Sequence, residues 1–548
     1  MVLTDILKRW QVLKGKPALL CTGTDEHGMK IQQAANNADR DPQDFCDEVS
    51  EKFKHLAERA NLSHDRFIRT TDEDHKEAVQ YFWTLLNERG WIYESKHQGW
   101  YCVSDETYYP ESQIEKRLDA VTGRTFMASQ ETGKEVEWTS EANYHFKLSA
   151  FRDKLLDYYK AHPDFILPSS RMAEVTSWLE AGLEDLSISR PISRLTWGIP
   201  VPQDDSQTIY VWLDALVNYA TVAGFPGQSF HDGTGGWPAD VHVIGKDIMR
   251  FHCIYWPAFL MALDLPLPKQ ILTHAHWTME NQVRLHPPYP QTITFLTTGQ
   301  KMSKSIGNVV SPEFAMNKFG TDTMRFYLAH DGGIENDADY SNDYITERYR
   351  KCLAGGIGNL VQRLTKPKAW SVRASVERAQ SGLVDYEEAI EHRRMLGGVR
   401  ESVDERFKEL NPRKALLEIM DIIYQTNKHV QDQEPWAKIK QLDDPSRVEL
   451  TESIIYDCAE AVRIAGIMLQ PYMPAKAGEV LDMLGVSQEQ RTFDDAVYGK
   501  DLDYGVSTWT TTERGEFATL FPPLLGDNIG KPLKKNAKKS KKLAEMEN

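Results

Sequence analysis

Two lysines in a short polar loop give the strongest chemical signal in the chain. Lys301 and Lys304 lie in the run KMSKS, which Ile-Gly-Asn follows. Lysines at this spacing can close over a polyphosphate and neutralise the charge that develops during nucleotidyl transfer. The same run could be a solvated turn, so its interpretation depends on the motifs that accompany it.

A carboxylate follows the first strand that the sequence predicts. Asp25 lies in the run TGTDEHG (22–28), directly after a strand predicted over 18–22. Ligands of open α/β sheets bind at the carboxyl ends of the strands, where this carboxylate could hold a substrate ammonium. Alternatively, Asp25 could cap the helix predicted to follow it.

A second strand leads into a segment with the features of a nucleotide site. The strand 241–245 ends at Gly245, which allows close approach of a nucleotide, and Asp247 could accept hydrogen bonds from ribose hydroxyls. Ile248, His252 and Trp256 recur at i, i+4 and i+8, on one face of a predicted helix. Such a stripe is more often core than pocket, so the pattern leaves both open.

A third segment combines aromatic and small side chains. In YVWLDALVNY (210–219), Trp212, Ala215 and Tyr219 share one helical face. Aromatic rings beside a small residue form a slot suited to a polarisable thioether.

The elements that must position these residues indicate a split α/β domain followed by a helical one. Helices are predicted at the N-terminus and over 44–60 and 74–90, and short β-like runs fill 91–145. Strand–helix order resumes with the strands at 241 and 271, and helical periodicity dominates 345–485.

Composition excludes several classes. The chain has 548 residues, a net charge of −16 and six cysteines without a CxxC pair, which argues against a disulfide scaffold and a four-cysteine zinc site. No run is apolar and long enough to span a bilayer. An acidic chain binds nucleic acid only through local patches. The Lys-rich end, 531–542, is either a solvated tail or a phosphate clamp.

In this combination and order, the motifs resemble those of the class I methionyl-tRNA synthetases, in their mitochondrial, fungal form. The resemblance also includes WYCVSDETYYPESQ (100–113), SRLTWGIPVP (193–202) and HVIGKDIMRFH, and runs from residue 1 to about 525. It implies a Rossmann-type α/β catalytic domain with an inserted connective domain, followed by an all-α anticodon-binding domain. The boundaries it implies are 1–90 and 146–330 for the catalytic domain, 91–145 for the connective domain, 331–365 for the stem-contact region, 366–525 for the anticodon domain and 526–548 for the basic tail.

The resemblance implies roles for the candidate binding and catalytic residues. Asp25 would bind the methionine ammonium, Gly245 and Asp247 the adenosine, and Lys301 and Lys304 the ATP phosphates, as the catalytic pair. The methionine side chain would lie among the residues of the two helical stripes and their neighbour, namely Trp212, Ala215, Leu216, Tyr219, Ile248, His252 and Trp256. Leu216 stands where some relatives have proline.

The implied reaction converts L-methionine and ATP into methionyl-adenylate and pyrophosphate, and then transfers the acyl group to methionine tRNA. Mg²⁺ would accompany ATP. The implied location is the mitochondrial matrix, without a membrane, and we expect a monomer.

The connective domain departs from relatives that carry zinc. Of the expected thiolates only Cys102 is present, while Asp105, Ser129 and Thr132 occupy positions where others would stand. Tetrahedral zinc needs three or four good ligands, so we predict no zinc.

In the helical domain, TNKHVQDQEPW matches a family segment that reads the anticodon. An amide and an aromatic face suit splayed bases, which nominates Asn427 and Trp436. A cap and a core tryptophan are the alternative.

The chain also departs from the family at its start. The family has a strand and an HxGH motif before the helix that residues 1–10 resemble, and HxGH occurs nowhere here. We therefore expect a gene model that begins at an internal methionine, with any presequence upstream. The chain as written is expected to form methionyl-adenylate poorly, because loss of one such charge-stabilising group costs on the order of a hundred- to a thousandfold.

An unusual insert precedes the lysine loop. Relatives have only a few residues between HWTM (276–279) and KMSKS, whereas here 281–298 intervene in a Pro-rich run. Its Gln-Val-Arg start suggests a retained intron, and a lineage-specific loop is the alternative.

Two other functions remain open at this stage. A non-catalytic tRNA-binding protein would retain the anticodon domain and tail without ATP–pyrophosphate exchange. A ligase for another apolar amino acid is disfavoured, because the connective segment is too short for an editing domain.

Overall fold

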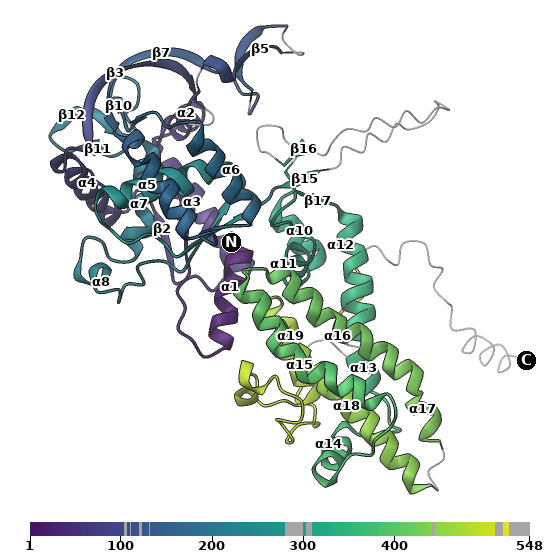
Figure 1. The fold of residues 1–548 in the computed structure, drawn as a ribbon. Helices are drawn as coiled ribbons and strands as arrows, with labels where there is room; N and C mark the ends of the chain where they lie inside the picture. Colours follow the sequence, from purple (N-terminus) through teal and green to yellow (C-terminus); the bar gives the residue numbers. More distant parts are fainter. Residues whose placement is uncertain are drawn as a thin grey trace, which may run out of the picture. The chain divides into compact units, whose positions relative to one another are not determined.

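The computed structural model describes residues 1–103, 107–109, 111–119, 123–130, 132–279, 300–302, 309–440, 444–509 and 519–524. The chain divides into two compact units, which Figure 1 draws as a ribbon. Unit 1 comprises Met1–Val309, Leu328–Ser341 and Val403–Leu416, and unit 2 comprises Val310–Tyr327, Asn342–Ser402 and Leu417–Asn548. These limits differ from the six-part division that the resemblance implies, which stays a prediction.

Unit 1 is built on short parallel strands that helices cover, which confirms the α/β class. Strand β1 (Cys21–Thr24) pairs in parallel with β2 (Arg66–Arg69). In a second sheet, β14 (Gln270–His274) pairs in parallel with both β13 (Val241–Gly245) and β8 (Ile166–Leu167). The helices of this unit are α1 (Val2–Leu13), α2 (Met29–Asn37), α3 (Pro42–Arg59), α4 (Glu73–Glu88), α5 (Arg152–Ala161), α6 (Ser169–Glu180), α7 (Val211–Val222), α8 (Gln228–His231) and α9 (Trp256–Ala262).

The first strand begins at Cys21, later than the sequence suggests, and it carries a glycine for a steric reason. A Cβ on Gly23 would lie 1.9 Å from the carbonyl oxygen of Ile68 on β2. Only glycine permits this approach of the two backbones, one residue before β1 ends at Thr24 and the loop bearing Asp25 begins.

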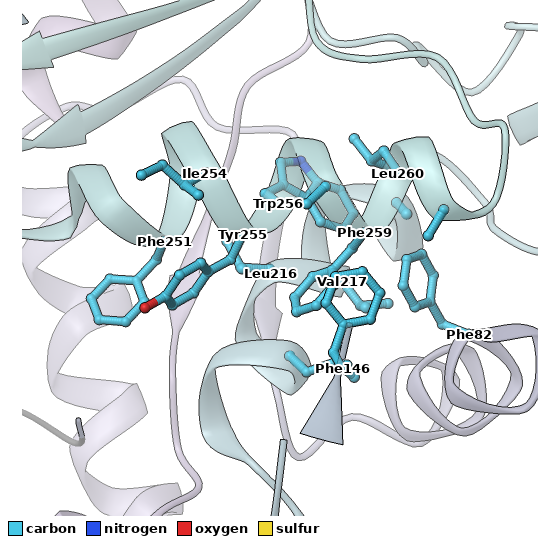
Figure 2. Packing of buried hydrophobic residues seen from close by; sticks show 14 of the residues in the cluster. Phe82, Phe146, Leu216, Val217, Phe251, Ile254, Tyr255, Trp256, Phe259 and Leu260 are labelled. Carbon is cyan, nitrogen blue, oxygen red and sulfur yellow. The ribbon is translucent and has the colours of Figure 1, made fainter. Parts of the chain in front are cut away.

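Aromatic side chains dominate the core of unit 1. Phe82 of α4, Phe146, and Trp256 and Phe259 of α9 are all fully buried in one cluster, as Figure 2 shows. Phe82 stacks on Trp256, and Phe146 meets Phe259 edge to face. Rings of this size bury large apolar areas and hold their helices in fixed positions.

A β-rich segment lies between the two parts of the parallel structure, as the texture of 91–145 predicts. Long strands β3 (Ile92–Cys102) and β7 (Glu137–Phe146) pair antiparallel and lie side by side in Figure 1. The other strands of this segment and its neighbours are β4 (Thr107–Tyr109), β5 (Ile114–Leu118), β6 (Thr125–Ser129), β9 (Leu186–Ser187), β10 (Ser189–Pro191), β11 (Pro200–Val201) and β12 (Asp204–Ile209).

Three short strands lie near the lysine motif. Strand β15 (Trp277–Met279) pairs antiparallel with β16 (Gln300–Lys301) and in parallel with β17 (Ala338–Tyr340). The insert 281–298 falls between β15 and β16 and lies outside the described residues.

Unit 2 is helical, as the periodicity of 345–485 predicts. Its central helix, α18 (Pro445–Leu469), is almost entirely buried from Thr451 onward. The remaining helices, three of which (α11, α15 and α16) are shared with unit 1 in part, are α10 (Pro312–Phe319), α11 (Thr321–Asp331), α12 (Asn342–Arg348), the π-helix η5 (Tyr349–Gly358), α13 (Asn359–Thr365), α14 (Val372–Ser381), α15 (Ala389–Lys408), α16 (Pro412–Gln433), α17 (Pro435–Lys438) and α19 (Pro474–Leu484). Within the described part of the chain, no helix is both long and apolar enough to cross a membrane.

Candidate active site

The loop after β1 is held rigidly by the residue next to Asp25. Glu26 is buried and accepts two hydrogen bonds of 2.8 Å from the guanidinium of Arg69, which lies at the end of β2. The hydroxyls of Thr24 and Thr71 also donate to this carboxylate, each at a distance of 2.6 Å. The loop therefore has little freedom, and it presents the neighbouring Asp25 in a fixed place.

Asp25 itself is a carboxylate that the protein leaves available. Gly28, with φ of 104°, occupies the N-cap of α2, so Asp25 does not cap this helix. Its side chain makes no hydrogen bond or ion pair with any residue that the structure describes, and it reaches solvent. The surrounding protein nevertheless desolvates it and, together with the charge of Asp214, raises its pKa to about 6. Such an uncompensated carboxylate suits a cationic ligand group.

The helix α7 brings Trp212, Ala215 and Tyr219 to the same region. Trp212 is half-buried and stacks on Phe251, with ring centroids 3.4 Å apart. Ala215 and Leu216 are buried, and Tyr219 lies one turn further along α7. Burial raises the pKa of the Tyr219 hydroxyl, and the negative charge of Asp25 raises it further. Tyr219 therefore feels the charge of Asp25, and its role beside the predicted ammonium site stays a prediction.

Tyr219 and His252 form a hydrogen-bonded pair between the two stripes. The Tyr219 hydroxyl lies 2.8 Å from Nε2 of His252, whose Nδ1 lies 3.0 Å from the carbonyl of Ile248. Burial lowers the pKa of His252 to about 4, so the ring is neutral near pH 7. Nδ1 therefore carries the proton and donates to Ile248, while Nε2 accepts from Tyr219.

The second stripe does not lie on a regular α-helix, which corrects the sequence prediction. Residues 246–248 form a 3₁₀ turn (η3), and Phe251–Tyr255 form a π-helix (η4) that leads into α9. His252 and Trp256 still both face Tyr219, at ring-centroid distances of 5.6 and 6.3 Å. π-Segments within helices are frequent at functional sites.

Trp256 is the most deeply placed residue of this group. It is fully buried, and its indole N–H donates to Nε2 of His242 over 3.3 Å. Burial lowers the pKa of His242 to about 3, which leaves a neutral acceptor. Trp256 thus belongs to the core and packs beside Tyr219, and its place in a methionine pocket stays a prediction.

The predicted adenosine residues fold closely together. A Cβ on Gly245 would lie 2.6 Å from Oδ1 of Asp247, so the glycine is needed where the Asp247 side chain folds back. Asp247 is exposed and pairs with His276 at 3.3 Å. Lys246 binds Asp337 through both carboxylate oxygens, at 2.7 and 2.9 Å, which anchors the end of β13.

The two lysines predicted to be catalytic are only partly placed. Lys301 lies on β16, opposite Thr278, but its side chain is not described. Lys304 lies outside the described residues.

Comparison with known proteins decides what this arrangement is. Residues 1–283 and 291–365 match the family model described as tRNA synthetases class I (M). The gap at 284–290 falls inside the insert 281–298. The chain belongs to the class I methionyl-tRNA synthetases.

Individual relatives agree with this family. The Neurospora crassa protein named "Probable methionine--tRNA ligase, mitochondrial" is 53% identical over 538 residues, which cover 96% of this chain and 82% of the relative. The methionine–tRNA ligase of Rickettsia felis is 38% identical and covers 96% of this chain and 95% of its own length. A crystal structure of Mycobacterium tuberculosis methionyl-tRNA synthetase bound by methionyl-adenylate has a TM-score of 0.82, with 35% identity and 95% coverage of both chains. The family function is that of a methionine–tRNA ligase, which uses ATP.

The synthetase's predicted anticodon residues lie in unit 2. The amide nitrogen of Asn427 donates to the carbonyls of Gly356 and Ile423, over 3.3 and 3.0 Å. Gly356 has non-helical dihedral angles near the end of the π-helix η5, and its carbonyl accepts from the backbone N–H of Asn359 as well as from Asn427. Its amide donors serve the fold, which leaves Oδ1 as the group that could meet a base.

Trp436 has a partner that sequence reasoning missed. The guanidinium of Arg363, on α13, lies 5.2 Å from the centroid of the Trp436 ring. A cation–π pair of this kind presents flat faces on which unstacked bases can rest. Arg363 carries no motif signal of its own, because its partner lies far along the chain.

The synthetase's connective segment shows no metal cluster in its described part. Cys102 and Ser129 are both buried, and Asp105 lies outside the described residues. Among all residues that the structure describes, no group of three or more His, Cys, Asp or Glu side chains could hold a metal ion. The absence of zinc stays a prediction.

Sequence reasoning also missed a buried charged cluster in the synthetase. Asp214, between Trp212 and Ala215, accepts hydrogen bonds from both His27 and His75. An aspartate inside the apolar run VWLDAL was the available signal, because a buried carboxylate needs partners.

Proposed function

We propose that this chain is a mitochondrial methionine–tRNA ligase that acts in the matrix as a monomer, without bound zinc. The mitochondrial names of the Neurospora crassa and Candida albicans relatives support the location. Mg²⁺ would enter with ATP, as the family implies. One observation supports the assignment of the site best: the unpartnered carboxylate of Asp25 beside Tyr219.

In the proposed first step, Asp25 binds the ammonium of methionine. The thioether lies against Trp212, Ala215, Leu216, Tyr219, Ile248, His252 and Trp256. The Tyr219–His252 bond fixes both polar groups, so the slot meets the sulfur with defined dipoles rather than charges. A rigid loop and two packed helices hold the substrate carboxylate in one orientation.

The chemistry then needs positioning and charge neutralisation rather than a protein nucleophile. A carboxylate oxygen of methionine attacks the α-phosphorus of ATP, and the bond to pyrophosphate breaks. Gly245 and Asp247 bind the adenosine, and Lys301 and Lys304 neutralise charge on the leaving pyrophosphate.

The second step transfers the methionyl group to the terminal adenosine of methionine tRNA, with AMP as the leaving group. The segment 91–145 supports the acceptor end. Trp436, with Arg363 beside it, and Asn427 contribute to anticodon recognition, and the basic tail adds non-specific phosphate contacts.

The deciding experiment is methionine-dependent ATP–pyrophosphate exchange, measured for the chain as it stands and for a form without 281–298. Weak exchange with methionine, and none with leucine, isoleucine or valine, is expected, because HxGH occurs nowhere in the sequence. Tight tRNA binding without exchange or methionine binding in either form would favour the non-catalytic tRNA-binding alternative instead.

A further inference from the structure

A buried carboxylate joins the predicted ammonium site to the helix that carries the predicted thioether slot. Asp214 lies on α7 and is 1% exposed. Its Oδ2 lies 2.7 Å from Nδ1 of His27, two residues after Asp25 in the same loop. Its Oδ1 lies 2.8 Å from Nε2 of His75, on α4. Three segments distant in sequence therefore meet at one side chain.

Burying the Asp214 carboxylate costs free energy, and two specific hydrogen bonds offset that cost. Burial alone would raise the pKa of Asp214, but the charge and hydrogen bonds of His27 and His75 hold it below its ordinary value, so the group stays ionised. Each imidazole uses a different oxygen, and Nδ1 of His75 also meets the Thr221 hydroxyl at 3.1 Å. A well-packed apolar residue at this place would often be as stable, which makes a role beyond stability worth testing.

We infer that Asp214 is a positioning residue for methionine binding: through His27 it fixes the loop that presents Asp25 relative to α7. This inference rests on the proposed function, in which Asp25 binds the ammonium. The distance between the ammonium site and the side-chain slot decides which amino acid fits, and Asp214 is the hydrogen-bonded link between the segments that carry them.

The same carboxylate also adds negative charge beside Asp25. The groups that act on Asp25 are Asp214 on α7, His75 on α4, and His27 and Glu26 on its own loop. Glu26 is paired with Arg69, and Tyr219 of α7 is uncharged, because desolvation raises its pKa. Asp214 therefore favours protonation of Asp25, and removing its charge moves that protonation to lower pH.

The test is the variant Asp214→Asn in the full chain, with L-methionine binding measured by calorimetry from pH 5 to 8. Asparagine has nearly the same volume as aspartate. Its amide group, however, points hydrogens at one imidazole N–H, so one of the two hydrogen bonds to His27 and His75 is lost. We expect methionine affinity to fall about tenfold or more at pH 7.5, the size of one lost buried hydrogen bond. We also expect the acidic decline in affinity to move to lower pH than in the wild type.

Two controls separate positioning from general damage. Glu77→Gln, at an exposed position on α4, should bind like the wild type at every pH. If Asp214 acted on the fold alone, Asp214→Asn would lower the melting temperature and leave methionine affinity at pH 7.5 unchanged, which would overturn the inference. If Asp214→Asn does not fold, His27→Asn decides, because asparagine is too short to reach Asp214; unchanged affinity in that variant would overturn the inference.

The two proposals fail differently. Wild-type protein that binds no methionine would contradict the proposed function itself. Wild-type binding with an unaltered Asp214→Asn variant would contradict only the role of Asp214.

Discussion

The hydroxyl of Tyr219 donates to Nε2 of His252 over 2.8 Å, and this bond fixes the orientation of both rings. The opposite nitrogen of His252 is committed to the carbonyl of Ile248. The imidazole therefore has one orientation and one tautomer, set by α7 on one side and by the residues around the π-helix on the other. A thioether in contact with this pair would meet a neutral, preorganised surface.

We predict that Tyr219→Phe weakens methionine binding selectively. The substitution leaves Nε2 of His252 buried without a donor, a loss of about 1–3 kcal/mol. The KM for methionine in ATP–pyrophosphate exchange should rise about tenfold, the equivalent of about 1.4 kcal/mol, with the KM for ATP unchanged. An equal rise in both constants would show that the bond supports the fold rather than the slot.

Asp25→Asn should abolish methionine binding and also stabilise the protein. The folded pKa of about 6 lies above the ordinary value of 3.8. The folded state therefore binds more protons between these values and loses stability as pH rises through this range, a cost that persists at pH 7. Asparagine removes this cost, so the melting temperature should rise at pH 7 and change less at pH 4. Calorimetric titration with methionine, beside thermal melts of Glu77→Gln as control, checks both effects.

In the wild-type protein, the ionisation of Asp25 should determine how methionine affinity changes with pH. The ammonium of methionine needs an ionised partner, so affinity should decline as pH falls through about 6, where Asp25 takes up a proton. Affinity that stays constant from pH 7.5 to 5 would place the ammonium elsewhere.

Much of this site follows from local sequence rules. The strand-end position of Asp25 and the shared face of Trp212 and Tyr219 need only the order of elements and the 3.6-residue period. The rule fails at Phe251–Tyr255, because apolar residues four apart fit an α-turn and a π-turn almost equally. The π-segment packs against α7, a contact that the spacing does not encode.

Hydrogen-bond partners that lie far apart in the sequence could not be predicted from the sequence pattern. Asp214 is visible as a charge in an apolar helix, but its partners His27 and His75 come from two other segments. The amide of Asn427 looks available in the sequence, yet the carbonyls of Gly356 and Ile423 engage it. Both outcomes depend on which polar groups the fold brings together, because buried polar groups find hydrogen-bond partners.

Lys301→Ala and Lys304→Ala should each reduce the rate of exchange far more than methionine binding. Their proposed contact is with charge on the leaving pyrophosphate, and one such group is worth on the order of a hundred- to a thousandfold in kcat. Lys52→Ala, on the surface of α3, serves as control. Calorimetry with methionine should give the same affinity for all three variants, and a parallel loss of binding would contradict a role confined to the phosphates.

The Arg363–Trp436 pair gives a test of tRNA recognition that leaves adenylation aside. Arg363→Ala and Trp436→Ala should each reduce the charging of methionine tRNA, since base stacking on an aromatic face is worth about 1–3 kcal/mol. ATP–pyrophosphate exchange, which needs no tRNA, should be unchanged. Arg400→Ala is a matched control, because Arg400 lies over the ring of Phe493 at the same distance of 5.2 Å. Equal loss of charging in the control would attribute the effect to cation–π packing of the helices, whereas loss confined to Arg363 and Trp436 would locate the anticodon contact at this pair.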